Sequence, residues 1–402
     1  MGVDALGRLR AAASERASAG LRRSLVPRSS DFDGLLDLAS NDYLGLHGDP
    51  RVVEGAIAAA REWGTGSTGS RLVTGTTELH ARLESALASF CGAAEALVFS
   101  SGYLANMSVI SALTAALAAS GSGVLIVSDE RNHASLVDAC RLARGRSGVR
   151  LTVSPYQDVA AVRSLLAARA EESALVVSDG VFSVDGAVAP VAELHAAARE
   201  HGALLVLDEA HALGVLGPGG RGVAAAAGLA GEPDLVRTVT LSKSLASQGG
   251  AVLAATEVID TVVDTGRGFI FDTGLAPPSA GAALAALEVV RASPSLGARA
   301  LARAGRLAAA ASSLGLSVLP PSAAVVAVVL GDPLHAITAR EICAHNGVRA
   351  GCFRPPSVPA GQACLRLTAR ATMTEGDLSI AARALARVRE HEGVDVNPLF
   401  RQ

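Results

Sequence analysis

Lys243 is the residue of this 402-residue chain whose type most clearly indicates chemistry. It is the only lysine in the sequence, and every other Lys or Arg position is an arginine. An arginine stays protonated in proteins, whereas a lysine amine can lose its proton and bond to a carbonyl carbon. A lysine kept in such an arginine-rich background is therefore a candidate nucleophile, with chance retention as the alternative.

Other polar residues with chemical potential stand where short apolar runs end. Seven such runs predict strands, each followed by a helical pattern: Ala96–Ser100, Val124–Ser128, Arg150–Ser154, Ala174–Ser178, Ala203–Leu207, Val236–Leu241 and Ala251–Ala255. Runs that are apolar throughout favour strands covered on both faces, as in a mainly parallel sheet. Ligands bind beyond the carboxyl ends of such strands, and Tyr103, His133, Asp208 and Lys243 follow four of them.

After Pro277-Pro278 the alternation of apolar runs and helical patterns ends, and a long helical pattern rich in Ala and Arg begins. We predict an N-terminal arm over residues 1–48, a large α/β domain over 49–275 and a small α+β domain over 276–402. The small domain should contain a helix at Ala280–Ala292, strands near Ala324–Leu330 and Leu365–Thr368, and a terminal helix from Glu375 to about Glu390.

Composition excludes several classes of protein. The net charge of −3 and the lack of basic runs argue against nucleic-acid binding, and a hydrophobic fraction of 50% excludes disorder. The segment Met1–Arg23 has no apolar core, so we expect no signal peptide. The five cysteines form no C-x-x-C pair (Cys91, Cys140, Cys343, Cys352 and Cys364). An odd number without that spacing favours reduced thiols, a cytoplasmic location and no metal site.

Two uncharged stretches are long enough to span a bilayer, Ala96–Ser128 and Leu307–Gly331. Ser/Gly clusters divide the first into strand, helix and strand, and Pro320-Pro321 interrupts the second. Both stretches therefore favour buried elements of an α/β protein, and we expect no membrane contact.

Two familiar motifs have better alternatives here. Residues Gly64–Gly69 fit G-x-G-x-x-G, but a predicted helix at Val53–Trp63 precedes them, where a dinucleotide site requires a strand. We expect a glycine-rich loop near an active site instead. Residues Asp208–His211 resemble the acidic motif of ATP-driven helicases, but Lys243 lacks the upstream glycines of a phosphate-binding P-loop.

A strand-end carboxylate, a strand-end histidine and a single lysine fit pyridoxal phosphate chemistry. That cofactor needs an amine for a Schiff base, a carboxylate against its pyridine nitrogen, an aromatic surface over its ring and donors around its phosphate. Asp208 stands 35 positions before Lys243, far enough for one crossover between neighbouring strands. Singly, Asp208 could be a helix cap, His133 a core histidine and Lys243 a surface charge.

Nearly the whole chain, from about Arg22 to the terminal helix, resembles the α-oxoamine synthases, a family of fold-type I pyridoxal-phosphate enzymes. The motifs that carry the resemblance are Asn41–Leu46, Gly69–Arg71 with Gly75 and His80, Ser101–Tyr103, Asn132–Ser135, Gly180–Ser183, Asp208–His211, Thr240–Lys243, Phe353–Pro356 and Leu365–Thr368. The resemblance implies an α/β fold in which a large domain has a mainly parallel seven-stranded sheet and a smaller α+β domain lies at the C-terminus.

The resemblance also implies a cofactor site. Lys243 would form the Schiff base and act as a base, Asp208 would face the ring nitrogen, and His133 would stack on the ring. The remaining cofactor contacts would come from His211 and Ser183 on the phenolic oxygen side, and from Gly102, Tyr103, Thr240 and Thr273 at the phosphate. Because Thr273 resembles a residue lent by a partner subunit, a homodimer with its active sites at the interface is implied.

Substrate contacts are implied as well. Arg366 resembles the clamp on an amino-acid carboxylate, for which planar bidentate pairing favours arginine. Asn41, Arg22, Arg354 and Ser357 match substrate-contacting positions, although Arg22 and Arg354 could be ordinary surface arginines in this background.

Within the family, the likeness is greatest to the biotin-pathway member, particularly its actinobacterial form. This implies condensation of L-alanine with a pimeloyl thioester of CoA or acyl carrier protein, with loss of CO2. The alternatives are the members that join glycine to acetyl or succinyl thioesters, and a non-catalytic subunit, which would have lost the lysine.

Overall fold

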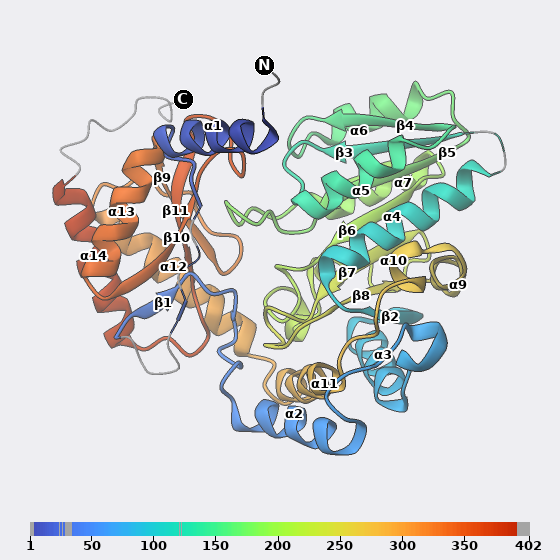
Figure 1. Ribbon diagram of the computed structural model, residues 1–402, viewed down its shortest axis with the longest axis horizontal. Coiled ribbons are helices and arrows are strands. Elements are labelled where there is room, and N and C mark those ends of the chain that lie inside the picture. Colours follow the sequence, from blue (N-terminus) through green and yellow to red (C-terminus); the bar gives the residue numbers. More distant parts are fainter. Residues whose placement is uncertain are drawn as a thin grey trace. The chain divides into compact units, whose positions relative to one another are not determined.

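The computed structural model describes residues 4–23, 25, 27–28, 34–119, 121 and 123–391. They form two compact units (Figure 1). The larger unit comprises Asn41–Leu301 and Arg370–Thr372, and the smaller comprises the described parts of Met1–Ser40, Ala302–Ala369 and Met373–Gln402. The division into segments 1–48, 49–275 and 276–402 stays a prediction, and parts of its first and last segments lie outside the described residues.

The larger unit is built on one seven-stranded sheet. Its strands, in chain order, are β2 (Glu95–Phe99), β3 (Val124–Asp129), β4 (Val149–Ser154), β5 (Ser173–Asp179), β6 (Leu204–Asp208), β7 (Leu235–Thr240) and β8 (Gly250–Ala254). The order across the sheet is β2-β8-β7-β6-β5-β3-β4. The pairs from β7 to β4 are parallel, and β8 is antiparallel to both β7 and β2. The predicted seven strands and mainly parallel sheet are confirmed.

One predicted connection is wrong. We expected a helix after every strand, but β7 and β8 are joined by the irregular segment 241–249. Antiparallel neighbours can be joined by a short loop, whereas parallel neighbours need a long crossover. Lys243 lies in this short connection, so its position is set by both strands.

Helices cover the sheet. The larger unit contains α2 (Pro50–Trp63), α3 (Glu78–Cys91), α4 (Gly102–Ala118), α5 (Ala134–Arg144), α6 (Val159–Ala167), α7 (Val191–Glu200), α8 (Val223–Ala226), α9 (Thr256–Thr265), α10 (Arg267–Ile270) and α11 (Pro277–Ala292), with short turns η1 (Arg71–Gly75) and η2 (Pro218–Gly220). Apolar residues of α4, α5, α9 and α10 pack on one set of alternating strand residues, including Ile126, Val177 and Val206. Because side chains alternate across a strand, the same strands use their other residues on the opposite face.

The smaller unit has a four-stranded sheet in the order β1-β10-β11-β9, in which the N-terminal segment pairs with the C-terminal part of the chain (Figure 1). Its elements are α1 (Ala5–Ser18), β1 (Leu36–Leu38), β9 (Val325–Gly331), α13 (Pro333–His345), β10 (Val348–Phe353), β11 (Ala363–Thr368) and α14 (Glu375–His391), and α12 (Leu296–Ser313) begins in the larger unit and ends in this one. The predicted strands and terminal helix of this region are confirmed. Strands β1 and β10 were not predicted, because β1 has three residues and β10 is only partly buried.

The two uncharged stretches are accounted for by ordinary elements. The first contains most of β2, all of α4 and most of β3, and the second contains the end of α12 and all of β9. Among the described helices, none combines the length and apolar character needed to cross a membrane.

Candidate active site

The predicted catalytic residues meet at one edge of the seven-stranded sheet. Strand β2 is antiparallel to β8, and β8 is antiparallel to β7, so β2 runs in the same direction as the parallel strands. The carboxyl ends of β2, β5, β6 and β7 therefore lie along the same edge. Asp208 ends β6, Lys243 follows β7, and Gly102 begins α4 after β2.

Lys243 is linked directly to the predicted residue His211, and through His211 and Tyr43 to the predicted residue Asn41. Its Nζ lies 2.9 Å from Nε2 of His211, whose Nδ1 lies 2.5 Å from the hydroxyl of Tyr43. The Tyr43 hydroxyl also lies 3.4 Å from Oδ1 of Asn41. Tyr43 is fully buried, so this series of hydrogen bonds fixes the His211 ring beside the lysine amine. Tyr43 was not predicted to have a role, although it lies in the motif Asn41–Leu46.

Asp208 is held as a hydrogen-bond acceptor. Its Oδ1 accepts from the backbone N–H of Ala210 at 2.8 Å, and its Oδ2 accepts from Nδ2 of Asn106 at 2.7 Å. The residue is buried at the end of β6. The two donated hydrogen bonds fix the orientation of the carboxylate. Asp208 therefore has the chemistry needed to pair with a protonated ring nitrogen.

His133 caps the start of α5. Its backbone N–H donates to Oδ2 of Asp179 at 3.0 Å, and its Nδ1 lies 2.7 Å from Oγ of Ser135. Although part of the residue is exposed, the surrounding protein lowers the pKa of its ring by desolvation, and Lys243 acts in the same direction. Asp208 and Asp138 oppose this shift. The balance favours a neutral, flat ring at this edge of the sheet.

Asp179 is a buried carboxyl at the end of β5, next to Asp208 in the sheet register. Burial, with the charge of Asp208 adding to it, raises the pKa of Asp179 well above its ordinary value. The backbone N–H of His133 donates to it and acts in the opposite direction. Asp179 thereby connects the backbone of His133 to the carboxyl ends of β5 and β6.

Donors suited to a phosphate gather at the start of α4. The hydroxyls of Thr240 and Ser242 lie 2.7 Å apart, and Ser101 caps the helix that begins at Gly102. A Cβ on Gly102 would lie 3.2 Å from Cβ of Thr240, and one on Gly250 would lie 2.4 Å from Cα of Gly102. These glycines let the helix N-terminus approach β7 and β8 closely, and free N–H groups at a helix start bind anions. Tyr103 in the first turn directs its hydroxyl to Asp138 at 2.7 Å, which leaves its backbone for this role.

The two remaining predicted cofactor contacts lie in loops. Ser183 is half-buried and follows Val181, which forms an isolated bridge with Val188. Thr273 is exposed, and its backbone forms an isolated bridge with Ser70. The glycine-rich segment Gly64–Gly69 follows α2 directly, so the helix predicted before it is confirmed.

The predicted substrate residues other than Asn41 belong to the smaller unit. Arg354 donates to the backbone carbonyl of Gly20, and Arg23 lies 3.5 Å from Oγ of Ser357. Arg22, which is exposed, therefore stands in a segment that contacts Arg354 and Ser357. The structure brings these three predicted residues to one region.

Arg366 lies on β11 and is buried. Its guanidinium carbon lies 5.5 Å from the centre of the Phe353 ring, and Nη1 lies 3.4 Å from Oγ1 of Thr368. A guanidinium placed on an aromatic face keeps its planar donors oriented for a carboxylate. This arrangement suits the predicted role of Arg366.

Sequence reasoning missed three buried residues of this edge: Asn106, Ser135 and Thr238. Asn106 donates to both Asp208 and Ser135, and it accepts from the hydroxyl of Thr238. A signal existed, because an asparagine within the uncharged, mostly apolar helix α4 requires hydrogen-bond partners when it is buried.

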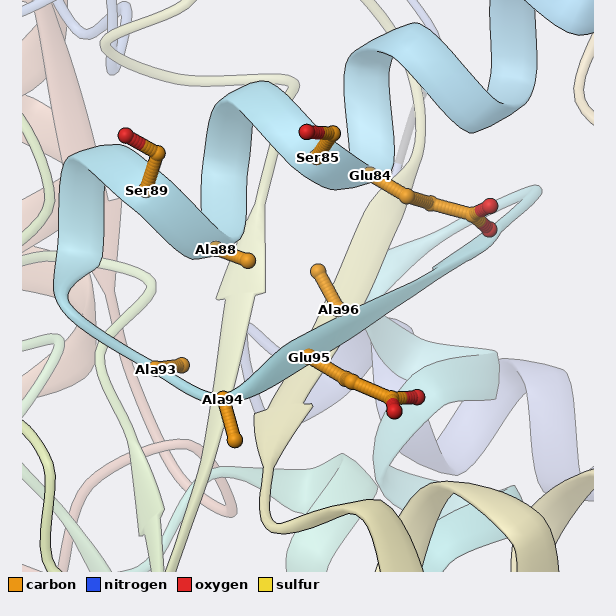
Figure 2. A pocket seen from close by; sticks show the side chains of 8 residues that line it. All are labelled: Glu84, Ser85, Ala88, Ser89, Ala93, Ala94, Glu95 and Ala96. Atoms are coloured by element: carbon orange, nitrogen blue, oxygen red, sulfur yellow. The ribbon is translucent and has the colours of Figure 1, made fainter.

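A separate pocket of the larger unit contains none of the predicted site residues (Figure 2). It is lined by the end of α3 and the start of β2: Glu84, Ser85, Ala88, Ser89, Ala93, Ala94, Glu95 and Ala96. Glu84 already accepts from Arg71 at 2.8 Å and from the backbone of Val98 at 2.9 Å, and Glu95 accepts from Thr256 at 2.7 Å. Both carboxylates have structural partners, and none of the predicted site residues lines this pocket.

Comparisons with known proteins show the family of the chain. The sequence model of the family aminotransferase class I and II matches residues 33–385. The chain is 55% identical over 387 residues to the 8-amino-7-oxononanoate synthase of Mycobacterium sp. strain JLS, covering 96% of this chain and 97% of that protein. It is 54% identical over 373 residues to the enzyme of the same name from Mycolicibacterium smegmatis, covering 93% and 94%.

Solved structures show the same fold. Serine palmitoyltransferase of Sphingomonas wittichii superposes with a TM-score of 0.88 at 27% identity, covering 98% of this chain and all of that one. A structure described as SPT with its pyridoxal-phosphate internal aldimine gives 0.88 at 28% identity, with the same coverage. The 8-amino-7-oxononanoate synthase of Francisella tularensis gives 0.75 at 22% identity, covering 90% of this chain and all of that one, and so supports the fold alone.

The residues at the sheet edge fit pyridoxal phosphate. An amine, an acceptor carboxylate and paired hydroxyls at a helix start lie on neighbouring elements, and the close approach of Gly102 and Gly250 leaves no room for side chains at the phosphate donors. The chain is a pyridoxal-phosphate enzyme, in agreement with its family and with the structurally similar SPT that holds this cofactor. It belongs to the class I and II aminotransferase family and, within that family, to the 8-amino-7-oxononanoate synthases.

Proposed function

We propose that the protein condenses L-alanine with a pimeloyl thioester of CoA or acyl carrier protein, giving 8-amino-7-oxononanoate, CO2 and the free thiol. The observation that carries the proposal is the placement of Lys243 Nζ 2.9 Å from His211, at the sheet edge that also holds Asp208. The curated relatives that bear the name of this activity support the product.

Lys243 and Asp208 divide the acid–base work. Pyridoxal phosphate, when bound, supplies a ring that spreads the negative charge left at Cα of alanine. Lys243 Nζ accepts the proton from that Cα and later returns a proton to the product carbon. Asp208, held by Asn106 and by the backbone of Ala210, keeps a proton at the ring nitrogen. His211 orients the lysine amine, and Tyr43 fixes His211.

The other predicted residues position the reactants. Arg366 pairs with the alanine carboxylate, which is lost as CO2 after the new carbon–carbon bond has formed. Arg22, Arg354 and Ser357 contact the acyl substrate, and Asn41 is a further substrate contact. Gly102, Tyr103, Thr240 and Ser183 hold the cofactor together with the residues above.

A homodimer is part of the proposal. Thr273 would complete the phosphate site of the partner subunit. Three large apolar side chains are exposed beside the paired residues Ser70 and Thr273, and they would be covered by a second copy: Leu72, Val73 and Phe271. We also propose a cytoplasmic location, which the five cysteines without a disulfide support.

The test is a thiol-release assay that crosses alanine, glycine and serine with pimeloyl, acetyl, succinyl and palmitoyl thioesters. We expect the highest kcat/KM with alanine and the pimeloyl thioester. Faster turnover with glycine would assign the protein to the alternative members of the family. The same assay with CoA and with acyl carrier protein as the thiol identifies the carrier.

A further inference from the structure

Three buried polar side chains connect His133 to Asp208 within the larger unit. Asn106 of α4, Ser135 of α5 and Thr238 of β7 are each about 1% exposed. Asn106 Nδ2 lies 2.7 Å from Oδ2 of Asp208 and 2.9 Å from Oγ of Ser135. Ser135 Oγ lies in turn 2.7 Å from Nδ1 of His133. None of these three side chains was given a role above beyond support for Asp208.

The direction of the hydrogen bonds at Asn106 is fixed by its neighbours. A flipped amide would place its carbonyl oxygen against the Asp208 carboxylate, so that two acceptors faced each other at 2.7 Å. The hydroxyl of Thr238, 2.6 Å from Oδ1, supplies the donor that the carbonyl requires. Asn106 therefore donates to both Asp208 and Ser135.

This direction decides what Ser135 offers to His133. One lone pair of Ser135 Oγ is used by Asn106, and the hydroxyl proton can point to Nδ1 of His133. The backbone N–H of Ser135 also faces Nδ1, at 3.3 Å. Two donors aimed at one ring nitrogen require that nitrogen to be an acceptor, so the ring proton belongs on Nε2.

We propose that Asn106 and Ser135 are positioning residues that hold His133 as a neutral ring with its proton on Nε2, and that link this tautomer to the carboxylate of Asp208. The proposal deepens the role of the site and rests on the proposed function only for its catalytic consequence. It gives the residue facing the cofactor a single N–H donor, at Nε2, and a ring without charge.

The charged groups around His133 leave its ring neutral. Asp208 and Asp138 favour the charged ring, while desolvation and Lys243 disfavour it, and desolvation is the largest influence on its pKa. Asp179 accepts from the backbone N–H of His133 and not, among the described residues, from its ring nitrogens. The hydrogen bonds then choose between the two neutral tautomers.

The experiment is ¹⁵N NMR of the ring nitrogens in the full-length apoenzyme labelled at histidine, with His133→Gln used to assign the signal. For the wild type at pH 7.5 we expect a neutral His133 with the shift of a protonated Nε2 and an unprotonated Nδ1. A ring that is protonated on Nδ1, or charged, would overturn the proposal. This readout needs no turnover, so its failure and a failure of the proposed function are distinguishable.

Variants test the relay itself. In Ser135→Ala the two ring ¹⁵N shifts should move toward each other, as tautomers mix, whereas Ser135→Thr keeps the hydroxyl and should keep the wild-type pattern. Asn106→Asp replaces the donor by an acceptor, so the Ser135 proton turns away from His133 and the population protonated on Nδ1 should increase. Unchanged His133 shifts in Asn106→Asp would contradict a link to Asn106.

A matched control is Ser111→Ala, which removes a buried hydroxyl from α4, the helix of Asn106. This hydroxyl accepts from Arg146 at 3.3 Å. It should leave the His133 signals unchanged, and a change as large as in Ser135→Ala would show only a general disturbance of the packed helices α4 and α5. In the loaded enzyme, Ser135→Ala should also shift the pH profile of the cofactor absorbance, while Ser111→Ala should not.

Discussion

Two regions of the molecule hold their functional residues in different ways. One is the edge of the seven-stranded sheet, and the other is the part of the smaller unit with Arg22, Arg354 and Ser357, here called the arginine region. At the sheet edge, Asp208 and His211 are buried, and short hydrogen bonds to other buried side chains fix them. In the smaller unit, Arg354 and Ser357 are tied to the N-terminal segment, and Ser357 is exposed. The difference indicates that the sheet edge carries chemistry, which needs fixed atoms, while the arginine region contributes binding of a longer, more variable substrate.

The largest expected effect is at the sheet edge. Lys243→Arg keeps a positive charge but removes the amine that can lose its proton, so thiol release should fall by roughly 10³-fold or more. Borohydride reduction of the loaded wild type should label one internal peptide, the one with Lys243, because the chain has no other lysine. Turnover retained in Lys243→Arg would contradict the assignment of chemistry to the sheet edge and of substrate binding to the arginine region.

Next in size is the packing at the proposed phosphate donors. In Gly250→Ala the new Cβ would lie 2.4 Å from Cα of Gly102, which should lower the free energy of unfolding by about 1–3 kcal/mol and weaken cofactor binding. Denaturant unfolding and cofactor titration measure both effects. Gly305→Ala, in a helix with no atom within 4 Å of the new Cβ, is the control and should be slightly stabilising. Equal behaviour of the two variants would show that the close approach at Gly102 is not needed.

A smaller and selective effect is expected in the arginine region. Arg354→Ala should raise KM for the acyl thioester by roughly tenfold, about the worth of one charged hydrogen bond, and leave kcat nearly unchanged. Steady-state kinetics at saturating alanine measures this split. Arg383→Ala, at an exposed position of α14, should change neither constant. A fall in kcat as large as that in Lys243→Arg would place Arg354 in the chemical step instead.

Asp179 offers a pH test of the buried network. Its pKa is raised in the folded state, so stability falls as the pH rises from about the ordinary value of 3.8 through the raised one. Asp179→Asn keeps an acceptor for His133 and should flatten this fall in urea unfolding measured between pH 5 and 8. Asp49→Asn is the control, because the hydrogen bond from Arg51 lowers the pKa of this half-buried carboxyl. Its contribution to stability changes only at lower pH, so the slope between pH 5 and 8 should stay as in the wild type. An unchanged slope in Asp179→Asn would mean that the pKa of Asp179 is not raised in the folded protein.

The smallest effect concerns the turn that carries Lys243. Ala246 has a φ of 51°, a left-handed conformation that costs an alanine roughly 1 kcal/mol. Ala246→Gly should therefore stabilise the fold by up to about this amount, measured by denaturant unfolding. Ala309→Gly, on the exposed face of α12, should destabilise by about 0.5–1 kcal/mol. A loss of stability in Ala246→Gly would show that the turn is not strained.

Much of the larger unit could be predicted because its signals are local. Runs such as Val124–Ser128 and Ala174–Ser178 are apolar throughout, which is how a strand buried on both faces reads in a sequence. Strand β1 and the helix-free link between β7 and β8 could not be predicted, since a three-residue strand has no period and a connection depends on which strands become neighbours. Asn106 was missed for the same reason: its partners come from α5, β6 and β7.

The sequence by itself determined the residue types: one lysine, a strand-end aspartate, two histidines and the motifs that place the chain in its family. Residue types and spacing are enough for this, because each chemical role accepts few side chains. Only the tertiary structure decided which atoms face each other, such as Nζ of Lys243 and Nε2 of His211, and the direction of the hydrogen bonds from Asn106. Those choices depend on strand order and burial, which arise from contacts between residues far apart in the chain.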